Sequence, residues 1–143
     1  MTFFTRRHLL APVALLLTAV PNLLATEAVR RPKEAAEVWG RTELYFGTDK
    51  GGGEAVTDAD FNTFVDIYVT PRFPDGLTLL TGKGQFKNSN GVLIREKSHV
   101  LILFYPPQVQ DANKKIQEIR QFYKDGFGQE SVLRVDSFSF VSF

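Results

Sequence analysis

Residues 77–105, LTLLTGKGQFKNSNGVLIREKSHVLILFY, decide the fold of this chain. They contain two segments rich in β-branched, aromatic and other apolar residues, 77–87 and 92–105, joined by Asn88-Ser89-Asn90-Gly91. An Asn-Gly pair readily takes the positive φ angles of a tight turn between antiparallel strands. Pro106 and Pro107 end the second segment, because proline donates no ladder hydrogen bond. We therefore predict a β-hairpin in the middle of the chain.

A helix is expected on each side of this hairpin. The first begins with a capping-box pattern at Thr57 and Asp60 and ends at Pro71. Its apolar stripe is formed by Phe61, Phe64, Val65 and Tyr68. The second can be capped by Asp111 and stops at Gly126 or Gly128. Its apolar positions are Ala112, Ile116, Ile119 and either Phe122 or Tyr123.

Strands complete the pattern at both ends. Residues 39–47 alternate, which places Arg41, Glu43 and Tyr45 on one face and Thr42, Leu44 and Phe46 on the other. Residues 131–143 form a last strand. The order β-α-β-β-α-β is that of the ferredoxin-like fold, an α+β two-layer sandwich with two helices on one face of a four-stranded antiparallel sheet.

The other face of that sheet needs a cover. Residues 100–104, VLILF, are apolar toward both faces, and Phe138 and Phe140 add to the apolar surface. A second copy packed sheet to sheet, as in dimeric α/β barrels, would bury it, and we expect a homodimer. The alternative is that the N-terminal linker folds across the face.

The N-terminal 25 residues have the features of an export signal peptide. Arg6 and Arg7 precede an apolar run at 9–20, and Ala25 or Ala28 can serve as the cleavage site. Thr5-Arg6-Arg7-His8-Leu9-Leu10 is twin-arginine-like, the alternative being a general secretion signal. We divide the chain into signal 1–25, linker 26–38 and a single domain 39–143. The expected location is periplasmic or secreted, with no stable membrane span after cleavage.

Composition excludes several kinds of chemistry. The chain has no cysteine, which removes disulfides, thiolate nucleophiles and iron–sulfur clusters. With His8 in the signal, His99 is the only histidine of the exported part, so a two-histidine metal site within one subunit is excluded. Charges of both signs are interspersed, and no basic patch indicates nucleic acid. We expect no metal and no cofactor.

Four blocks of sequence resemble a known family. They are WGRTELYFG (39–47), VTPRFPDG (69–76), REKS (95–98) and FGQESVLR (127–134). In this order they are similar to a bacterial exported family described as domain of unknown function 3574, over about residues 39–143. The resemblance implies a small exported domain and carries no activity. This chain lacks the cysteine of the lipoprotein members.

Several polar residues are candidates for a ligand site. Arg41 and Glu43 share a face, and Arg134 with Asp136 repeat that spacing on the last strand, while Lys83 and Gln85 share a face of the second strand. If they converge, they would bind a small polar molecule bearing a carboxylate or phosphate, because arginine pairs with such groups. The alternative is a set of cross-strand ion pairs that fix strand register.

Other candidates stand apart from this cluster. Glu43 and Glu96 could form an acid–base pair, and His99 could act as a base. Arg72 lies in a loop stiffened by two prolines, where it either presents its charge to a ligand or pairs with Asp75. Residues 129–131 can cap the junction between the second helix and the last strand.

Three functions follow from these candidates. We favour a non-catalytic ligand-binding or assembly module that is dimeric through the sheet face. The alternative is a small periplasmic enzyme using carboxylate acid/base chemistry, with Arg41, Glu43 and Glu96 in one dimeric-barrel pocket. An accessory subunit of an envelope complex is the third.

Overall fold

The computed structural model of the chain describes residues 36–51 and 53–143. The predicted signal at 1–25 and most of the predicted linker at 26–38 lie outside the described residues. The first strand begins at Glu37, two residues before the expected start at Trp39. None of the described helices is long and apolar enough to cross a membrane.

Four strands and two α-helices form the domain, in the order β-α-β-β-α-β. The strands are β1 (Glu37–Gly47), β2 (Thr78–Lys87), β3 (Leu93–Tyr105) and β4 (Leu133–Val141). The helices are α1 (Asp58–Phe64), which continues as the π-helix η1 (Val65–Val69), and α2 (Ala112–Phe127). The sequence-based element order is confirmed.

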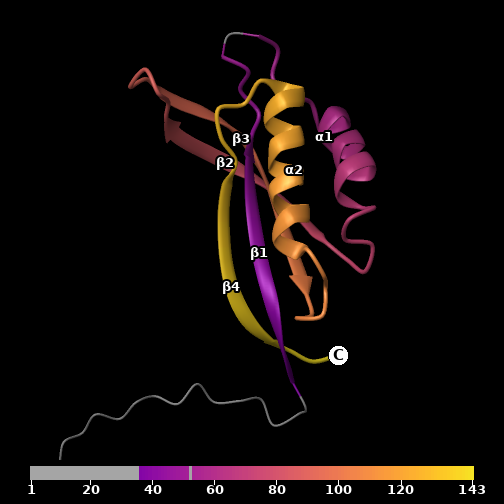
Figure 1. The fold of residues 1–143 in the computed structure, drawn as a ribbon. Helices are drawn as coiled ribbons and strands as arrows, with labels where there is room; N and C mark the ends of the chain where they lie inside the picture. Colours follow the sequence, from indigo (N-terminus) through magenta and orange to yellow (C-terminus); the bar gives the residue numbers. More distant parts are fainter. Residues whose placement is uncertain (1–35, 52) are drawn as a thin grey trace, which may run out of the picture. The chain divides into compact units, whose positions relative to one another are not determined.

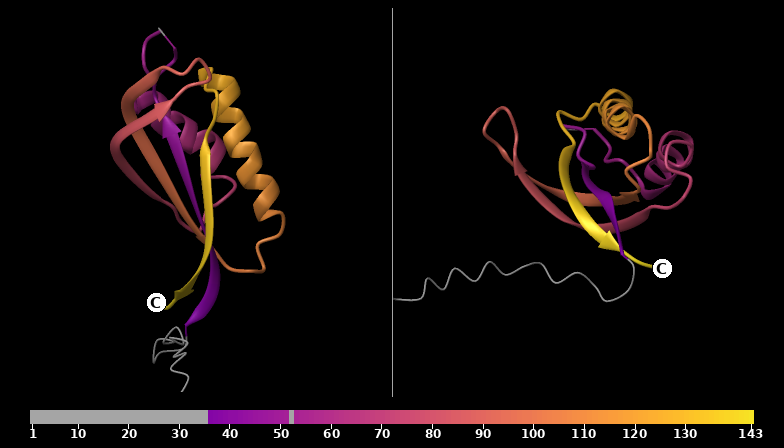
Figure 2. Two further views of the ribbon diagram at one scale, coloured as in Figure 1. Left: turned by 90° about the vertical axis from the view of Figure 1, so that its left-hand side faces the viewer. Right: turned by 60° about the horizontal axis from the view of Figure 1, so that its bottom comes forward.

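The strands form one antiparallel sheet in the order β2-β3-β1-β4. Both α-helices lie on the same side of this sheet, which we call its helix face (Figures 1 and 2). The opposite side, the open face, carries Arg41, Glu43 and Tyr45 of β1, as the alternation predicted. The protein is therefore a mixed α+β fold with a four-stranded antiparallel sheet.

The hydrophobic core lies between the helix face and the helices. Leu44 and Phe46 of β1 and Leu101 and Leu103 of β3 are fully buried there. The helices contribute Phe61, Phe64, Ile116, Ile119 and Tyr123. Tyr123, at 0% exposure, resolves the choice between it and Phe122, which is 38% exposed. The core rings pack edge to face, with the Phe46 and Tyr123 ring centroids 4.6 Å apart.

The first helix keeps its predicted cap but changes its winding. The Thr57 side chain accepts from the Asp60 backbone N–H, and the Asp60 side chain accepts from the Thr57 N–H, which is the capping box expected. After Phe64 the helix widens into η1, where the Thr70 N–H donates to the Val65 carbonyl five residues back at 2.9 Å. The apolar stripe alone did not indicate this π turn.

The second helix lacks the predicted cap at its N-terminal end but ends at one of the two predicted glycines. Asp111 precedes it, but the prediction that its side chain caps the helix is wrong. Asp111 has φ 58°, and its side chain makes no capping hydrogen bond. Its backbone carbonyl accepts the first hydrogen bond of the helix, from the Lys115 N–H. At the other end Gly128 has φ 67°, a left-handed conformation in which glycine is favoured, and its N–H donates to the Lys124 carbonyl.

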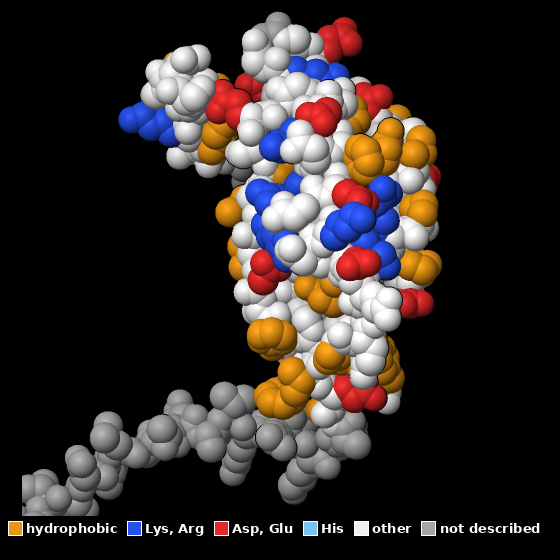
Figure 3. Space-filling view, viewed as in Figure 1, with side chains coloured by type: hydrophobic (Ala, Val, Ile, Leu, Met, Phe, Trp, Pro, Cys, Tyr) orange, Lys and Arg blue, Asp and Glu red, His pale blue; other side chains and the backbone are white. Residues whose placement is uncertain are grey.

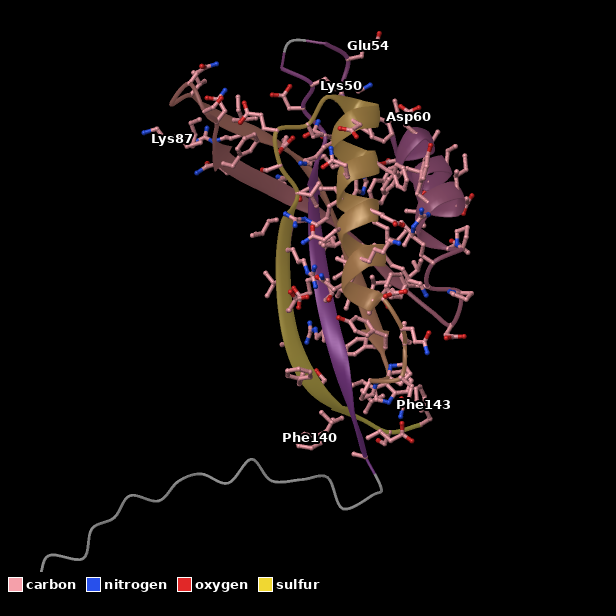
Figure 4. All side chains as sticks on the ribbon, viewed as in Figure 1. Lys50, Glu54, Asp60, Lys87, Phe140 and Phe143 are labelled. Carbon is pink, nitrogen blue, oxygen red and sulfur yellow. The ribbon has the colours of Figure 1, made fainter. Side chains whose placement is uncertain are left out.

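Phe138 and Phe140 do not add to the open face. Antiparallel pairing sets Phe138 opposite Gly40 and Phe140 opposite Val38, on the helix-face side of the sheet. This end of β1 and β4 extends beyond the helices, so that Phe138 is 83% exposed. Hydrophobic side chains gather there (Figure 3), and Phe140 and Phe143 mark it in Figure 4. The sheet therefore has an apolar tip separate from its open face.

Candidate functional site

A pocket of about 220 Å³ lies on the open face, at the end of the sheet where the β2–β3 hairpin projects (Figure 4, Lys87). We call it the sheet-face pocket. All four strands and the loop between α2 and β4 contribute to it. Its lining residues are Tyr45, Gly47, Gly84, Gln85, Phe86, Glu96, Ser98, Gln129, Glu130, Ser131 and Leu133.

Glu96 of β3 is held rigidly at one wall of this pocket. Its Oε2 atom accepts hydrogen bonds from the backbone N–H groups of Thr48 and Asp49, both at 2.6 Å. Its carboxylate occupies the space beside Gly47, where a β-carbon would lie only 2.3 Å from Oε1. The chain after β1 therefore fixes the position of the Glu96 carboxylate.

Glu130, in the segment before β4, also lines the pocket. Its carboxylate accepts from the Ser89 hydroxyl at 2.9 Å and from the Ser89 N–H at 3.3 Å. Ser89 lies in the hairpin turn, so this contact joins the hairpin to the segment before β4, although β2 and β4 are opposite edges of the sheet (Figure 2). Gln129 adds a bond to the Asp49 carbonyl at 2.6 Å. The loop after β1, the turn between β2 and β3, and the loop between α2 and β4 thus meet around the pocket.

A polar row runs along β1 from the pocket toward the middle of the open face. The Tyr45 hydroxyl, at the pocket, donates to Glu43 at 2.5 Å, and Arg41 pairs with Glu43 at 2.6 Å. The hydrogen bond to Glu43 raises the pKa of Tyr45. The Arg41 guanidinium also lies 5.5 Å from the Phe104 ring centroid. Arg41 and Glu43 themselves do not line the pocket.

Arg134 does not converge with Arg41 and Glu43. The β1–β4 register sets Arg134 opposite Leu44 and Asp136 opposite Thr42, which puts both on the helix face. There Arg134 donates to Asp136 at 3.0 Å and to Asn113 of α2 at 2.7 Å. Arg134 thus ties the edge strand to α2.

Gln85 and Lys83 also share the helix-face side of the hairpin, opposite Arg95 and Lys97. Gln85 accepts from Arg95 at 3.0 Å, yet it also lines the sheet-face pocket beside Glu96. Of the predicted ligand-binding candidates, the structure therefore brings together two pairs: Arg41 with Glu43, and Gln85 with Glu96.

Arg72 is committed to the helices. Its Nε donates to Glu118 at 3.1 Å and its Nη1 to the Tyr68 carbonyl at 2.8 Å, while its guanidinium lies 4.9 Å from the Phe122 ring centroid. The structure gives it these partners in place of the Asp75 pairing considered from the sequence. Arg72 borders a second cavity of about 260 Å³ with Phe73 and Tyr105.

His99 is buried in the core on the helix-face side. Its ring stacks on Phe61 with centroids 4.0 Å apart, and its Nδ1 lies 3.2 Å from the Thr81 hydroxyl. Its Nε2 lies 3.5 Å from an Asp58 oxygen that also pairs with Lys97. Burial lowers the pKa of His99, and the bond from Lys97 lowers that of Asp58. This cluster lies away from the sheet-face pocket and stabilises the start of α1.

Most residues of the pocket lining could not be recognised as site residues from the sequence. Tyr45, Gly47, Phe86, Ser98 and Leu133 carried no predicted role, and Glu130 was considered only as part of a junction. A usable signal existed: three of the four family-like blocks, 39–47, 95–98 and 127–134, meet at this pocket. Within the described residues, no group of three or more acidic or histidine side chains is arranged to hold a metal ion.

The fold and the pocket define a small α+β domain whose open sheet face carries a candidate ligand site. Residues 41–143 match the sequence profile of the family described as protein of unknown function (DUF3574), and the chain belongs to this family. The resemblance seen in the sequence is thereby confirmed. No curated protein matches the chain.

Solved structures with a similar fold include two of phage SAM lyases. One is a phage SAM lyase in complex with S-methyl-5'-thioadenosine, with 16% identity, a TM-score of 0.59, and coverage of 73% of this chain and 90% of that one. The other is a phage SAM lyase in the apo state, with 15% identity, a TM-score of 0.54, and coverage of 81% and 97%. At these identities the likeness is one of fold.

Proposed function

We propose that this protein is an exported, non-catalytic module that binds a small molecule in the sheet-face pocket and works as a homodimer through its open face. The observation that carries the proposal is the fixed carboxylate of Glu96 in a pocket bounded by three connections. A site whose polar groups are already held in place loses little entropy when a ligand binds.

Apolar exposure on the open face supports a second copy as its cover. Central β3 residues that face this side, Val100 and Ile102, are only half-buried in one copy. The exposed apolar residues on the same face are Leu80, Phe86, Phe104, Leu133 and Val135. A patch of this kind is typical of an interaction surface. Two such sheets packed open face to open face would form a dimer of the dimeric α/β barrel type, and this is the arrangement that we propose.

Charge on the open face also favours a copy of the same chain. Arg41 and Glu43 lie side by side, so a two-fold axis near them would bring each arginine toward the partner's glutamate. The Arg41 side chain is 37% exposed in one copy, which leaves it accessible to such a carboxylate.

The enzyme alternative has less support. It requires Arg41, Glu43 and Glu96 in one cavity, and only Glu96 lines the sheet-face pocket. Because a solved structure of the same fold is a SAM lyase bound to S-methyl-5'-thioadenosine, SAM and that thioether are the first compounds to test. If the protein consumes SAM and a Glu96 variant does not, the enzyme function replaces the binding function.

Native mass spectrometry of the exported protein tests the proposal directly. We expect the mass of a dimer, with a retained small molecule that Glu96→Ala loses. Val135→Lys, on the open face, should give monomers. Phe138→Lys is the matched control, since Phe138 is more exposed but lies on the other face of the same strand. A monomeric wild type at micromolar concentration would overturn the dimer. Dissociation by Phe138→Lys but not by Val135→Lys would overturn the open face as its interface.

A further inference from the structure

The charges around the sheet-face pocket are of one sign. Glu96 and Glu130 are the charged residues of its lining, and no lysine or arginine lines it. The nearest basic residues along β3, Arg95 and Lys97, lie on the other face and are paired with Gln85 and Asp58. A ligand carboxylate or phosphate would therefore meet negative charge without a compensating cation.

Glu96 keeps one oxygen atom for a ligand. Both backbone N–H groups that hold the carboxylate bond to Oε2. Oε1 has no hydrogen-bond partner among the described residues. Glu130, in contrast, uses both oxygens on Ser89. The pocket thus offers one anchored, unshared carboxylate oxygen, which is a strong acceptor for a charged donor.

Aromatic rings complete this environment. Tyr45 and Phe86 line the pocket from β1 and β2, on either side of β3. The faces of aromatic rings attract cations, and most strongly those that are weakly hydrated, such as alkylammonium groups. The remaining polar side chains of the lining are neutral; they are Gln85, Ser98, Gln129 and Ser131.

We propose that the ligand of the sheet-face pocket is a small organic cation, an alkylammonium or sulfonium compound. The inference rests on the proposed binding function and reverses the expectation, from the arginines alone, of an anionic ligand. Glu96 Oε1 neutralises the positive charge, and Tyr45 and Phe86 contact the alkyl groups around it.

Matched pairs of probes test this choice of charge. The wild type is titrated with choline, putrescine and trimethylsulfonium, and each is compared with a neutral molecule of the same shape, for choline 3,3-dimethylbutan-1-ol. Amide chemical shifts of the pocket residues report binding at the site. We expect at least one cation to bind more than about tenfold more tightly than its neutral partner.

Substitution of the carboxylate gives the second readout. Glu96→Gln keeps one oxygen as the acceptor for Thr48 and Asp49 and replaces the other oxygen by a neutral NH2 group. Its melting temperature should therefore stay close to that of the wild type, while the preference for the cation is lost. Glu54→Gln is the control, because Glu54 is exposed and does not line the pocket (Figure 4).

Two results would overturn the inference. One is that neutral probes bind as well as their cations; the other is that no cation shifts the pocket amides at millimolar concentration. Neither result decides the binding function itself. That is decided by whether native mass spectrometry finds a retained molecule that Glu96→Ala releases.

Discussion

The carboxylate of Glu96 stands where a side chain at position 47 would begin: a β-carbon on Gly47 would lie 2.3 Å from Glu96 Oε1. The absence of a side chain at Gly47 is therefore what lets Glu96 reach the backbone N–H groups of Thr48 and Asp49. This relationship places a charged group at the wall of a pocket and fixes the course of the chain after β1.

Gly47→Ala should displace Glu96 and destabilise the protein. The flexible carboxylate can move away, but the N–H groups of Thr48 and Asp49 then lose their acceptor, which costs about 1–3 kcal/mol. Urea denaturation measures the loss. In a Glu96→Ala background the same substitution should cost little, because the displaced group is already gone. Gly82→Ala is the control, since no atom lies within 4 Å of its β-carbon; equal losses at both glycines would contradict the explanation.

Tyr123→Phe should lower the free energy of unfolding by about 1–3 kcal/mol. The fully buried Tyr123 hydroxyl donates to the Gly47 carbonyl at 2.8 Å, and its loss leaves that carbonyl without this partner. Tyr68→Phe, at a half-buried position, should change stability less. Thermal unfolding of the two variants side by side checks the difference, and a larger loss for Tyr68→Phe would exclude the assigned role.

Stability should fall as the pH drops below about 6.5. Burial lowers the pKa of His99 below its ordinary value of 6.5, so the unfolded chain takes up a proton at a higher pH than the folded protein does. The stabilisation is complete above pH 6.5 and is lost as the pH falls through the folded pKa. Asp58, which faces His99 beside Lys97, has a pKa lowered from 3.8, so its own contribution is lost only in more acidic solution.

His99→Gln removes the histidine and so separates its pH dependence from that of Asp58. Its overall stability should be lower, because the stacking on Phe61 is lost, but the slope of unfolding free energy against pH just below pH 6.5 should flatten. An unchanged slope in this variant would assign the pH dependence to another group.

Arg6→Lys and Arg7→Lys together should abolish export if the signal is of the twin-arginine type. Immunoblotting of periplasmic and cytoplasmic fractions measures the result. The pair Arg30 and Arg31 offers a matched control, since it is not followed by an apolar run; its double lysine variant should be exported normally. Normal export of the Arg6 and Arg7 variant would favour the general secretion route.

The fold could be predicted because the spacing of apolar residues in each helix and strand matches the period of that element. The Asn90-Gly91 turn, the stripe from Phe61 to Tyr68 and the alternation in β1 are local signals, and the element order follows from them. The π turn at Val65–Val69 and the left-handed conformation of Asp111 could not be predicted. Neither has a local sequence signal, because both depend on packing against distant parts of the domain.

The site was predictable only in part, because strand register is not local. Shifting β4 by one residue against β1 would have put Arg134 on the open face with Arg41; the actual register puts it opposite Leu44, on the helix face. Likewise, nothing near Glu130 in the sequence indicates that it reaches Ser89 in the hairpin turn. Glu96 could be named as a candidate because it is a carboxylate, but its contacts with Thr48 and Asp49 are seen only in the structure.

The sheet-face pocket takes lining from every strand, Tyr45, Gly84, Glu96 and Leu133 coming from β1, β2, β3 and β4 in turn. A chain with any one strand undocked therefore has no complete site. A ligand present during biogenesis would therefore bind finished molecules alone and draw the folding equilibrium toward them by mass action. A molecule with an occupied pocket would then be one whose four strands are all docked.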